Sequence, residues 1–85
     1  MEKKLLELKF NCSGNGIFYL AEAVTIRNKD FRIKMMDIYS LVAKKFKTTS
    51  NRVERSIRHC IETSENKYKT LSNSEVINSL IIELK

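Results

Sequence analysis

The chain has 85 residues, enough for one small domain over residues 1–85 whose core needs every apolar helix face. Its 16 Lys and Arg against 10 Asp and Glu give a net charge of +6, which favours a polyanionic partner, and nucleic acid first. No stretch approaches the roughly 20 apolar residues of a membrane span, and the charged N-terminal MEKKLLELKF is unlike a signal peptide. We therefore expect a cytoplasmic protein without a membrane partner.

The clearest turn of the sequence, residues 13–16, separates the N-terminal segment from the helix expected after it. Before the turn, residues 5–12 have two interpretations, of which we prefer the helix. Their helix-forming residues favour a helix, whereas their alternation of apolar and polar residues is typical of a half-buried strand. After the turn, an apolar stripe predicts a helix over about residues 17–29, with Asn15 or Gly16 at its start. The stripe consists of Ile17, Leu20, Ala21 and Val24.

A polar break at residues 28–30 precedes a second helical pattern. Its apolar residues recur at intervals of four, three, four and four, as on one face of a helix. They are Phe31, Met35, Ile38, Val42 and Phe46. We therefore expect a helix that begins near Phe31 and continues into the next motif.

Residues 38–62 organise the chain, because their pattern predicts two short helices joined by a tight polar turn. Thr49 or Ser50 can cap the second helix by accepting a backbone N–H, and the small Ala43 allows the two helices to cross closely. The inner face of the second helix consists of Val53, Ile57, Cys60, Ile61 and Ser64. The motif predicts a helix-turn-helix, with its second helix over residues 50–64, inside an all-α bundle of four to five helices.

The outer face of this second helix is rich in arginine. With Val53 and Ile57 turned inward, a rotation of 100° per residue sends Glu54 to the flank and six residues outward. The six are Asn51, Arg52, Arg55, Arg58, His59 and Glu62. The planar fork of arginine matches the O6 and N7 acceptors of guanine, and a carboxylate accepts from N4 of cytosine. An ordinary solvated face with i,i+4 ion pairs is the alternative, but the motif and the basic charge favour DNA recognition.

The last element begins with a capping-box pattern, in which Ser72 is followed three residues later by Glu75. One face of the helix that follows carries Val76, Leu80, Ile81 and Leu84. We expect this helix to close the core or to form a dimer interface.

The sequence contains no residue pattern that indicates a catalytic site or a metal site. Cys12 and Cys60 lie far apart and are expected to be reduced thiols, and a zinc site that adds His59 lacks any paired-ligand spacing. One histidine, no phosphate-binding glycine loop and no nucleophile beside a base leave no catalytic constellation. We therefore expect no enzyme activity, cofactor, metal or small-molecule ligand.

Three segments, which together make up more than half of the chain, carry a family resemblance. They are GIFYLAEAV from Gly16, IYSLVAKKFKTTSNRVERSIRHCIE from Ile38 and SNSEVINSLIIELK from Ser72, with RVERSIRH as the most distinctive part. In these segments the chain resembles the C-terminal DNA-binding domain of the sporulation-initiation response regulators of endospore-forming bacteria. The resemblance implies an all-helical domain whose recognition helix enters the major groove.

The same resemblance implies roles for single residues. The positions that read bases in that family correspond to Arg52, Glu54 and Arg55. Its backbone or flanking contacts correspond to Asn51, Arg58 and His59. The segment between the recognition helix and the last helix is much shorter here than in that family. The sequence also holds no receiver domain, so we expect a shortened form to which control by a phosphorelay does not simply carry over.

These observations predict a sequence-specific double-stranded DNA-binding protein that regulates transcription in bacteria. Arg52 and Arg55 are expected to donate to guanine edges, and Glu54 to accept from cytosine or to orient an arginine. The expected phosphate contacts are Lys44, Lys45, Lys47, Arg58 and His59. Because one such domain reads few base pairs, we expect a homodimer on repeated half-sites. The alternatives are a helical interaction module or adaptor that sequesters a regulatory partner, and a structural role on DNA.

Overall fold

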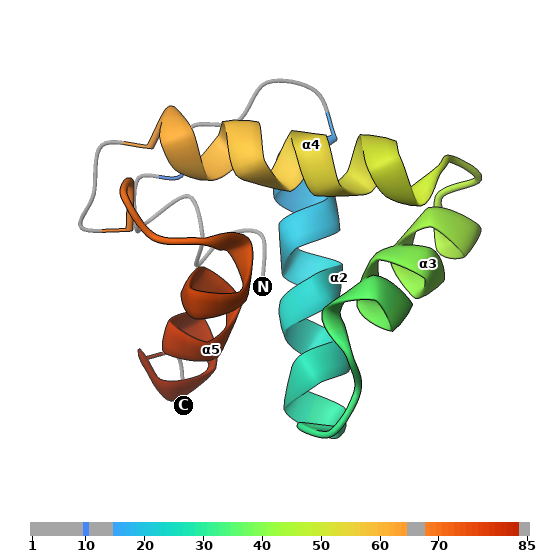
Figure 1. The fold of residues 1–85 in the computed structure, drawn as a ribbon, viewed down its shortest axis with the longest axis horizontal. Helices are drawn as coiled ribbons and strands as arrows, with labels where there is room; N and C mark the ends of the chain where they lie inside the picture. The colour runs from blue at the N-terminus through green and yellow to red at the C-terminus, as the bar shows by residue number, and fades with distance from the viewer. Residues whose placement is uncertain (1–9, 11–14, 65–67, 84–85) are drawn as a thin grey trace.

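The computed structural model describes residues 10, 15–64 and 68–83, and these contain four α-helices (Figure 1). The helices are α2 (Gly16–Lys29), α3 (Met35–Lys45), α4 (Ser50–Glu62) and α5 (Asn73–Glu83). No strand occurs within the described ranges, so the prediction of an all-α fold is confirmed for them. The choice between helix and strand for residues 5–12 falls outside these ranges, with the exception of Phe10.

Helix α2 lies in the centre and packs against α3, α4 and α5 (Figure 1). Its predicted apolar stripe is buried, and Tyr19 and Ala23 extend the buried surface beyond that stripe. A helix that is apolar around most of its circumference is stable only where other elements enclose it. Asn15 is the N-cap residue of α2, as expected, although its side chain accepts no capping hydrogen bond.

The helix expected from Phe31 begins instead at Met35. Asp30 explains the difference, because its Oδ1 accepts a hydrogen bond from Arg32 N at 2.9 Å. An aspartate that bonds the backbone two residues further on forms a local turn in place of a first helical turn. Arg27 supports this turn by donating from Nη1 to Phe31 O at 3.1 Å. The prediction of a helix at Phe31 is therefore wrong, and the Phe31 side chain is 55% exposed.

A tight turn joins α3 to α4, and it ends α3 with a Schellman-type pattern. Thr48 N donates to Ala43 O at 2.9 Å, and Lys47 between them has a φ of 55°, in the left-handed region. Thr49 then begins α4, because its Oγ1 accepts from Arg52 N at 3.2 Å, which confirms one of the two predicted caps. Hydrogen bonds at both ends of the turn therefore set the direction of α4 relative to α3.

Helix α5 begins with the predicted capping box. Ser72 N donates to Glu75 Oε1 and Glu75 N donates to Ser72 Oγ, each at 3.2 Å. The helix buries Val76, Ile77, Leu80 and Ile81. It packs against α2 and α4 and so closes the core, whereas Leu84 lies outside the described residues.

Tyr68 joins this core from the segment between α4 and α5. Its side chain is 2% exposed and stacks on Phe10, with the ring centroids 5.5 Å apart. The polar sequence around Tyr68 gives no periodic pattern that marks it as buried, so only the fold reveals its place.

Cys60, on the inner face of α4, is fully buried and disulfide-bonded. The expectation of a reduced thiol is therefore wrong for Cys60, and Cys12 lies outside the described residues. In the described part of the chain, no group of three or more His, Cys, Asp or Glu is placed to hold a metal ion.

Candidate nucleic-acid interface

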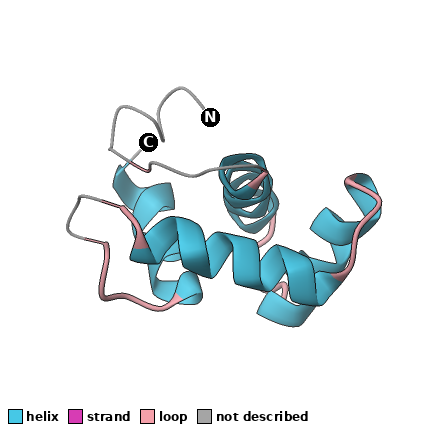
Figure 2. Cartoon of the chain, turned by 90° about the horizontal axis from the view of Figure 1, so that it is seen from above, coloured by secondary structure: helices cyan, strands magenta, loops and turns pink. Residues whose placement is uncertain are grey.

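Helix α4 runs along one edge of the molecule, across the other helices (Figures 1 and 2). Its inner residues Val53 and Ile57 are 0% exposed, whereas the six residues predicted to point outward are all exposed. These six form the surface that we call the α4 ridge: Asn51, Arg52, Arg55, Arg58, His59 and Glu62. The helix ends at Glu62 and not at residue 64, so the ridge occupies its whole length.

Two arginines of the α4 ridge, Arg52 and Arg55, have unengaged guanidinium groups. Among the residues that the structure describes, neither group makes a hydrogen bond or an ion pair. Each guanidinium carries five N–H donors in a fixed fork and no acceptor of its own. The ridge therefore presents two donor forks to any ligand rich in acceptors.

The third arginine of the ridge, Arg58, is held by Glu54. Its Nη2 donates to Glu54 Oε1 in an i,i+4 ion pair. The side chain of Arg58 is 63% exposed and that of Glu54 only 26% exposed, so the carboxylate lies on the flank of α4, as predicted. At Arg58, α4 therefore resembles an ordinary solvated helix face with an i,i+4 ion pair. At Arg52 and Arg55 the described residues form no such pair.

The three lysines predicted to contact phosphate differ in their surroundings. Lys45 Nζ donates to Glu22 Oε1 at 2.8 Å, which links α3 to α2, and lies 5.9 Å from the centroid of the Phe46 ring. Lys44 and Lys47 are exposed, and within the described ranges their ammonium groups have no hydrogen-bond or ion-pair partner. The basic end of α3 therefore has two available cations and one that is already paired.

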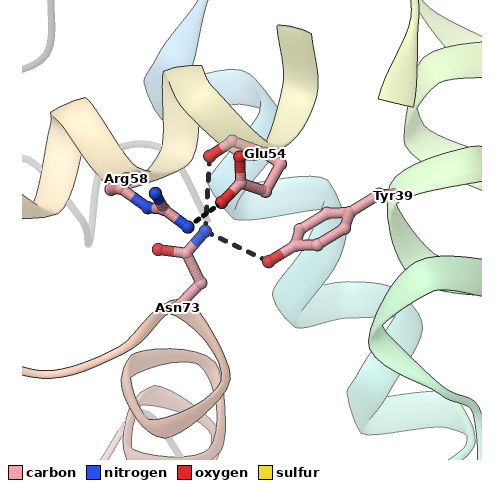
Figure 3. Close-up of polar contacts among 4 residues, drawn as sticks. All are labelled: Tyr39, Glu54, Arg58 and Asn73. Atoms are coloured by element: carbon pink, nitrogen blue, oxygen red, sulfur yellow. Dashed lines mark hydrogen bonds and ion pairs between the residues drawn. The ribbon is translucent and has the colours of Figure 1, made fainter. Parts of the chain in front are cut away.

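A residue that the sequence did not single out, Asn73, lies beside the α4 ridge at the start of α5. Its Nδ2 donates to Tyr39 Oη at 3.1 Å and to Glu54 O at 3.3 Å (Figure 3). In the sequence Asn73 simply follows the capping serine of α5, and its partners are 34 and 19 residues away. No local pattern reports contacts of that range.

Tyr39 accepts this hydrogen bond as a neutral hydroxyl. Burial raises the pKa of Tyr39 above its ordinary value of 10.0, and the negative charge of Glu54 adds to that effect. The hydrogen bond from Asn73 and the positive charge of Arg58 act in the opposite direction on the same pKa.

These residues line an open cleft of about 630 Å³ between α3, α4 and the start of α5, together with Glu62 and residues 69–72 and 74–75.

None of the helices that the structure describes is long and apolar enough to cross a membrane. The α4 ridge and the lysines at the end of α3 are exposed, and most of their side chains are basic. Residues 1–84 match the family model described as Sporulation initiation factor Spo0A C terminal, which is essentially the whole chain. That family is one of DNA-binding effector domains of a sporulation response regulator, and not of enzymes. The chain therefore belongs to the Spo0A C-terminal family.

Proposed function

We propose that residues 1–85 form one sequence-specific DNA-binding domain that regulates transcription in the bacterial cytoplasm. In this proposal α3, the turn and α4 act as a helix-turn-helix, with α4 in the major groove. The observation that carries the proposal is the α4 ridge. Its Arg52 and Arg55 guanidinium groups have no partner among the described residues, while Val53 and Ile57 hold the opposite face in the core. A B-DNA major groove admits one α-helix, and a convex, basic helix edge suits it.

The proposed reading mechanism divides the basic residues by their availability. Arg52 and Arg55 donate to the O6 and N7 acceptors of guanine, which requires both prongs of the fork. Glu54 orients Arg58, which then meets a phosphate or a flanking base. Further phosphate contacts come from Asn51, His59, Lys44, Lys47 and, once it leaves Glu22, Lys45.

Two copies of the domain on repeated half-sites complete the proposal. A single helix contacts only three or four base pairs, too few for a site that is rare in a genome. A homodimer on DNA doubles the number of bases read. A contact between the two copies through α5 would cover the side chain of Ile82, which is apolar and 77% exposed.

Selection of bound sequences from a random duplex library tests the proposal and also returns half-site and spacing. We expect one enriched motif, bound more tightly than a scrambled duplex of equal length. Arg55→Ala should lower affinity for the selected duplex by more than it lowers affinity for the scrambled duplex, because the lost charge affects both duplexes but the lost base contacts affect only the selected one. An equal loss on both duplexes would contradict base reading by Arg55.

A protein-interaction module is the second candidate, favoured by the exposure of Phe31 at 55% and Met36 at 79%. Salt dependence separates the two functions. For duplex DNA the logarithm of affinity falls with the logarithm of salt concentration with a slope of about −0.9 per phosphate neutralised. A partner bound through apolar side chains should show a slope near zero.

A further inference from the structure

The carboxamide of Asn73 lies where three helices meet. Asn73 is the first residue of α5 and is 8% exposed, and its Nδ2 reaches Tyr39 Oη on α3 at 3.1 Å and the Glu54 carbonyl of α4 at 3.3 Å (Figure 3). One nitrogen with two N–H groups can serve both acceptors at once. The three helices are therefore joined through a single side chain.

Of the three helices at this junction, α3 and α5 have little other contact with each other. The packed pairs are α2 with each of the others, α3 with α4, and α4 with α5, so α3 and α5 do not form a packed pair. The bond from Asn73 to Tyr39 is thus a direct polar link between them. The capping box of Ser72 and Glu75 fixes the backbone on which Asn73 stands, so the link starts from a rigid point.

The acceptor on α4 lies within the stretch that carries the unengaged arginines. Glu54 stands directly before Arg55 and two residues after Arg52. A carbonyl in mid-helix has a second lone pair, and a donor placed on it from another helix opposes rotation and sliding of that turn. Hydrogen bonds to base edges hold only over a donor–acceptor range of about 2.7–3.2 Å, so a small rotation of α4 removes one prong of a fork.

We propose that Asn73 is a positioning residue for base recognition: it fixes the rotation of α4 so that Arg52 and Arg55 meet their bases together. The proposal rests on the proposed function, since it concerns how the α4 ridge reads DNA. It assigns the selectivity of α4 partly to a residue of α5 that stands outside the ridge. Asn73 need not touch a base to act in this way.

Asn73→Asp tests the proposal with almost no change of side-chain volume. A carboxylate can accept from the Tyr39 hydroxyl, which reverses the direction of that hydrogen bond, but it cannot donate to the Glu54 carbonyl. Aspartate is favourable in the first turn of a helix, so α5 should still form. Asn78→Asp is the matched control, because Asn78 is exposed on the same helix and the substitution adds the same charge.

The measurement is the ratio of affinities for the library-selected duplex and its scrambled counterpart. We expect Asn73→Asp to lower this ratio about fivefold or more, the lower end of what one bidentate base contact contributes. Asn78→Asp should lower the affinity for both duplexes by the same factor and leave the ratio unchanged. A purely structural role would lower the melting temperature without changing the ratio, so circular dichroism is recorded for each variant.

Tyr39→Phe provides a second route, because it removes one acceptor of the junction and keeps the ring. We expect a smaller fall in the same ratio, and this variant decides the question if Asn73→Asp does not fold. An unchanged ratio in the folded variants, while Arg55→Ala lowers it, would overturn the positioning role and leave the proposed function in place. A wild-type chain that binds both duplexes equally would overturn the proposed function, and the positioning role with it.

Discussion

Two groups of basic side chains in this protein carry the same charge but differ in how they are held. In the described part of the chain the guanidinium groups of Arg52 and Arg55 have no hydrogen-bond or ion-pair partner, whereas Lys45 and Arg58 are each paired with a carboxylate. An exposed ion pair is worth only about 0–1 kcal/mol, so pairing does not remove a cation from use but does restrict its direction. Net charge therefore explains attraction to a polyanion, and pairing decides which cations are available for specific contacts.

The largest expected effect comes from removing the support beneath the ridge. Ile57→Ala should lower the free energy of unfolding by about 2–5 kcal/mol, because Ile57 is 0% exposed in the core. Urea denaturation followed by circular dichroism measures the change. Arg55→Ala, on the opposite face, is the control and should change stability by no more than about 0.5 kcal/mol. Equal destabilisation by both variants would contradict the division of α4 into a buried face and a free face.

Arginine-to-lysine changes sharpen the difference between unengaged and paired arginines. Arg52→Lys keeps the charge and removes the fork, so binding to the selected duplex should weaken by about 1–3 kcal/mol while scrambled DNA is bound as before. Arg58→Lys should cost less, because a lysine can still pair with Glu54 and meet a phosphate. Fluorescence anisotropy with both duplexes gives the comparison. A larger loss from Arg58→Lys would reverse the assignment of the two arginines.

A third comparison concerns two lysines with different backbone conformations. Lys47 has a φ of 55°, where glycine is favoured, so Lys47→Gly should stabilise the domain by about 0.5–1 kcal/mol. Lys44 lies in helix α3, where Lys44→Gly should destabilise it by about 0.5–1 kcal/mol. Both variants lose one positive charge, so both should lower the affinity for the scrambled duplex to a similar extent. Thermal melts that shift in the same direction for the two variants would contradict the left-handed turn.

The smallest expected effect comes from releasing Lys45. Glu22→Gln removes the carboxylate that Lys45 Nζ meets at 2.8 Å, and stability should fall by no more than about 1 kcal/mol because this pair is exposed. Affinity for any duplex should rise slightly, since the released ammonium can contact a phosphate. Ala substitution of Lys45 in the Glu22→Gln background should cancel this gain. A gain that persists would contradict the assignment to the Lys45 ammonium, because the double variant has the net charge of the wild type.

The sequence predicted those parts of the fold that depend on neighbours along the chain. Periodicity located α2, α4 and α5, and the caps at Thr49 and Ser72 followed from side chains three residues from their partners. The apolar spacing predicts a start of α3 near Phe31, four residues too early, because it does not register the competing turn at Asp30. The sequence also predicts which residues of α4 point outward, because the rotation per residue of a helix is a local property.

The rest of the candidate site depends on contacts between distant residues. That Lys45 meets Glu22, and that Asn73 meets Tyr39 and Glu54, follows from how the helices pack. No spacing within one helix encodes such a meeting. The buried state of Tyr68 and the bonded state of Cys60 likewise result from tertiary structure.

The central place of α2 has a consequence for how this domain responds to a ligand. Because α2 packs against α3, α4 and α5, none of these three can separate without exposing it to water. Unfolding should therefore be a single transition, and a duplex bound anywhere on α4 should protect the whole chain. At a free duplex concentration 100 times the Kd, linkage adds about 2.7 kcal/mol, which corresponds to a rise in Tm of more than 10 °C at about 4–8 °C per kcal/mol. A simple heating curve, with and without DNA, thus reports occupancy of a helix edge that contributes little to the core itself.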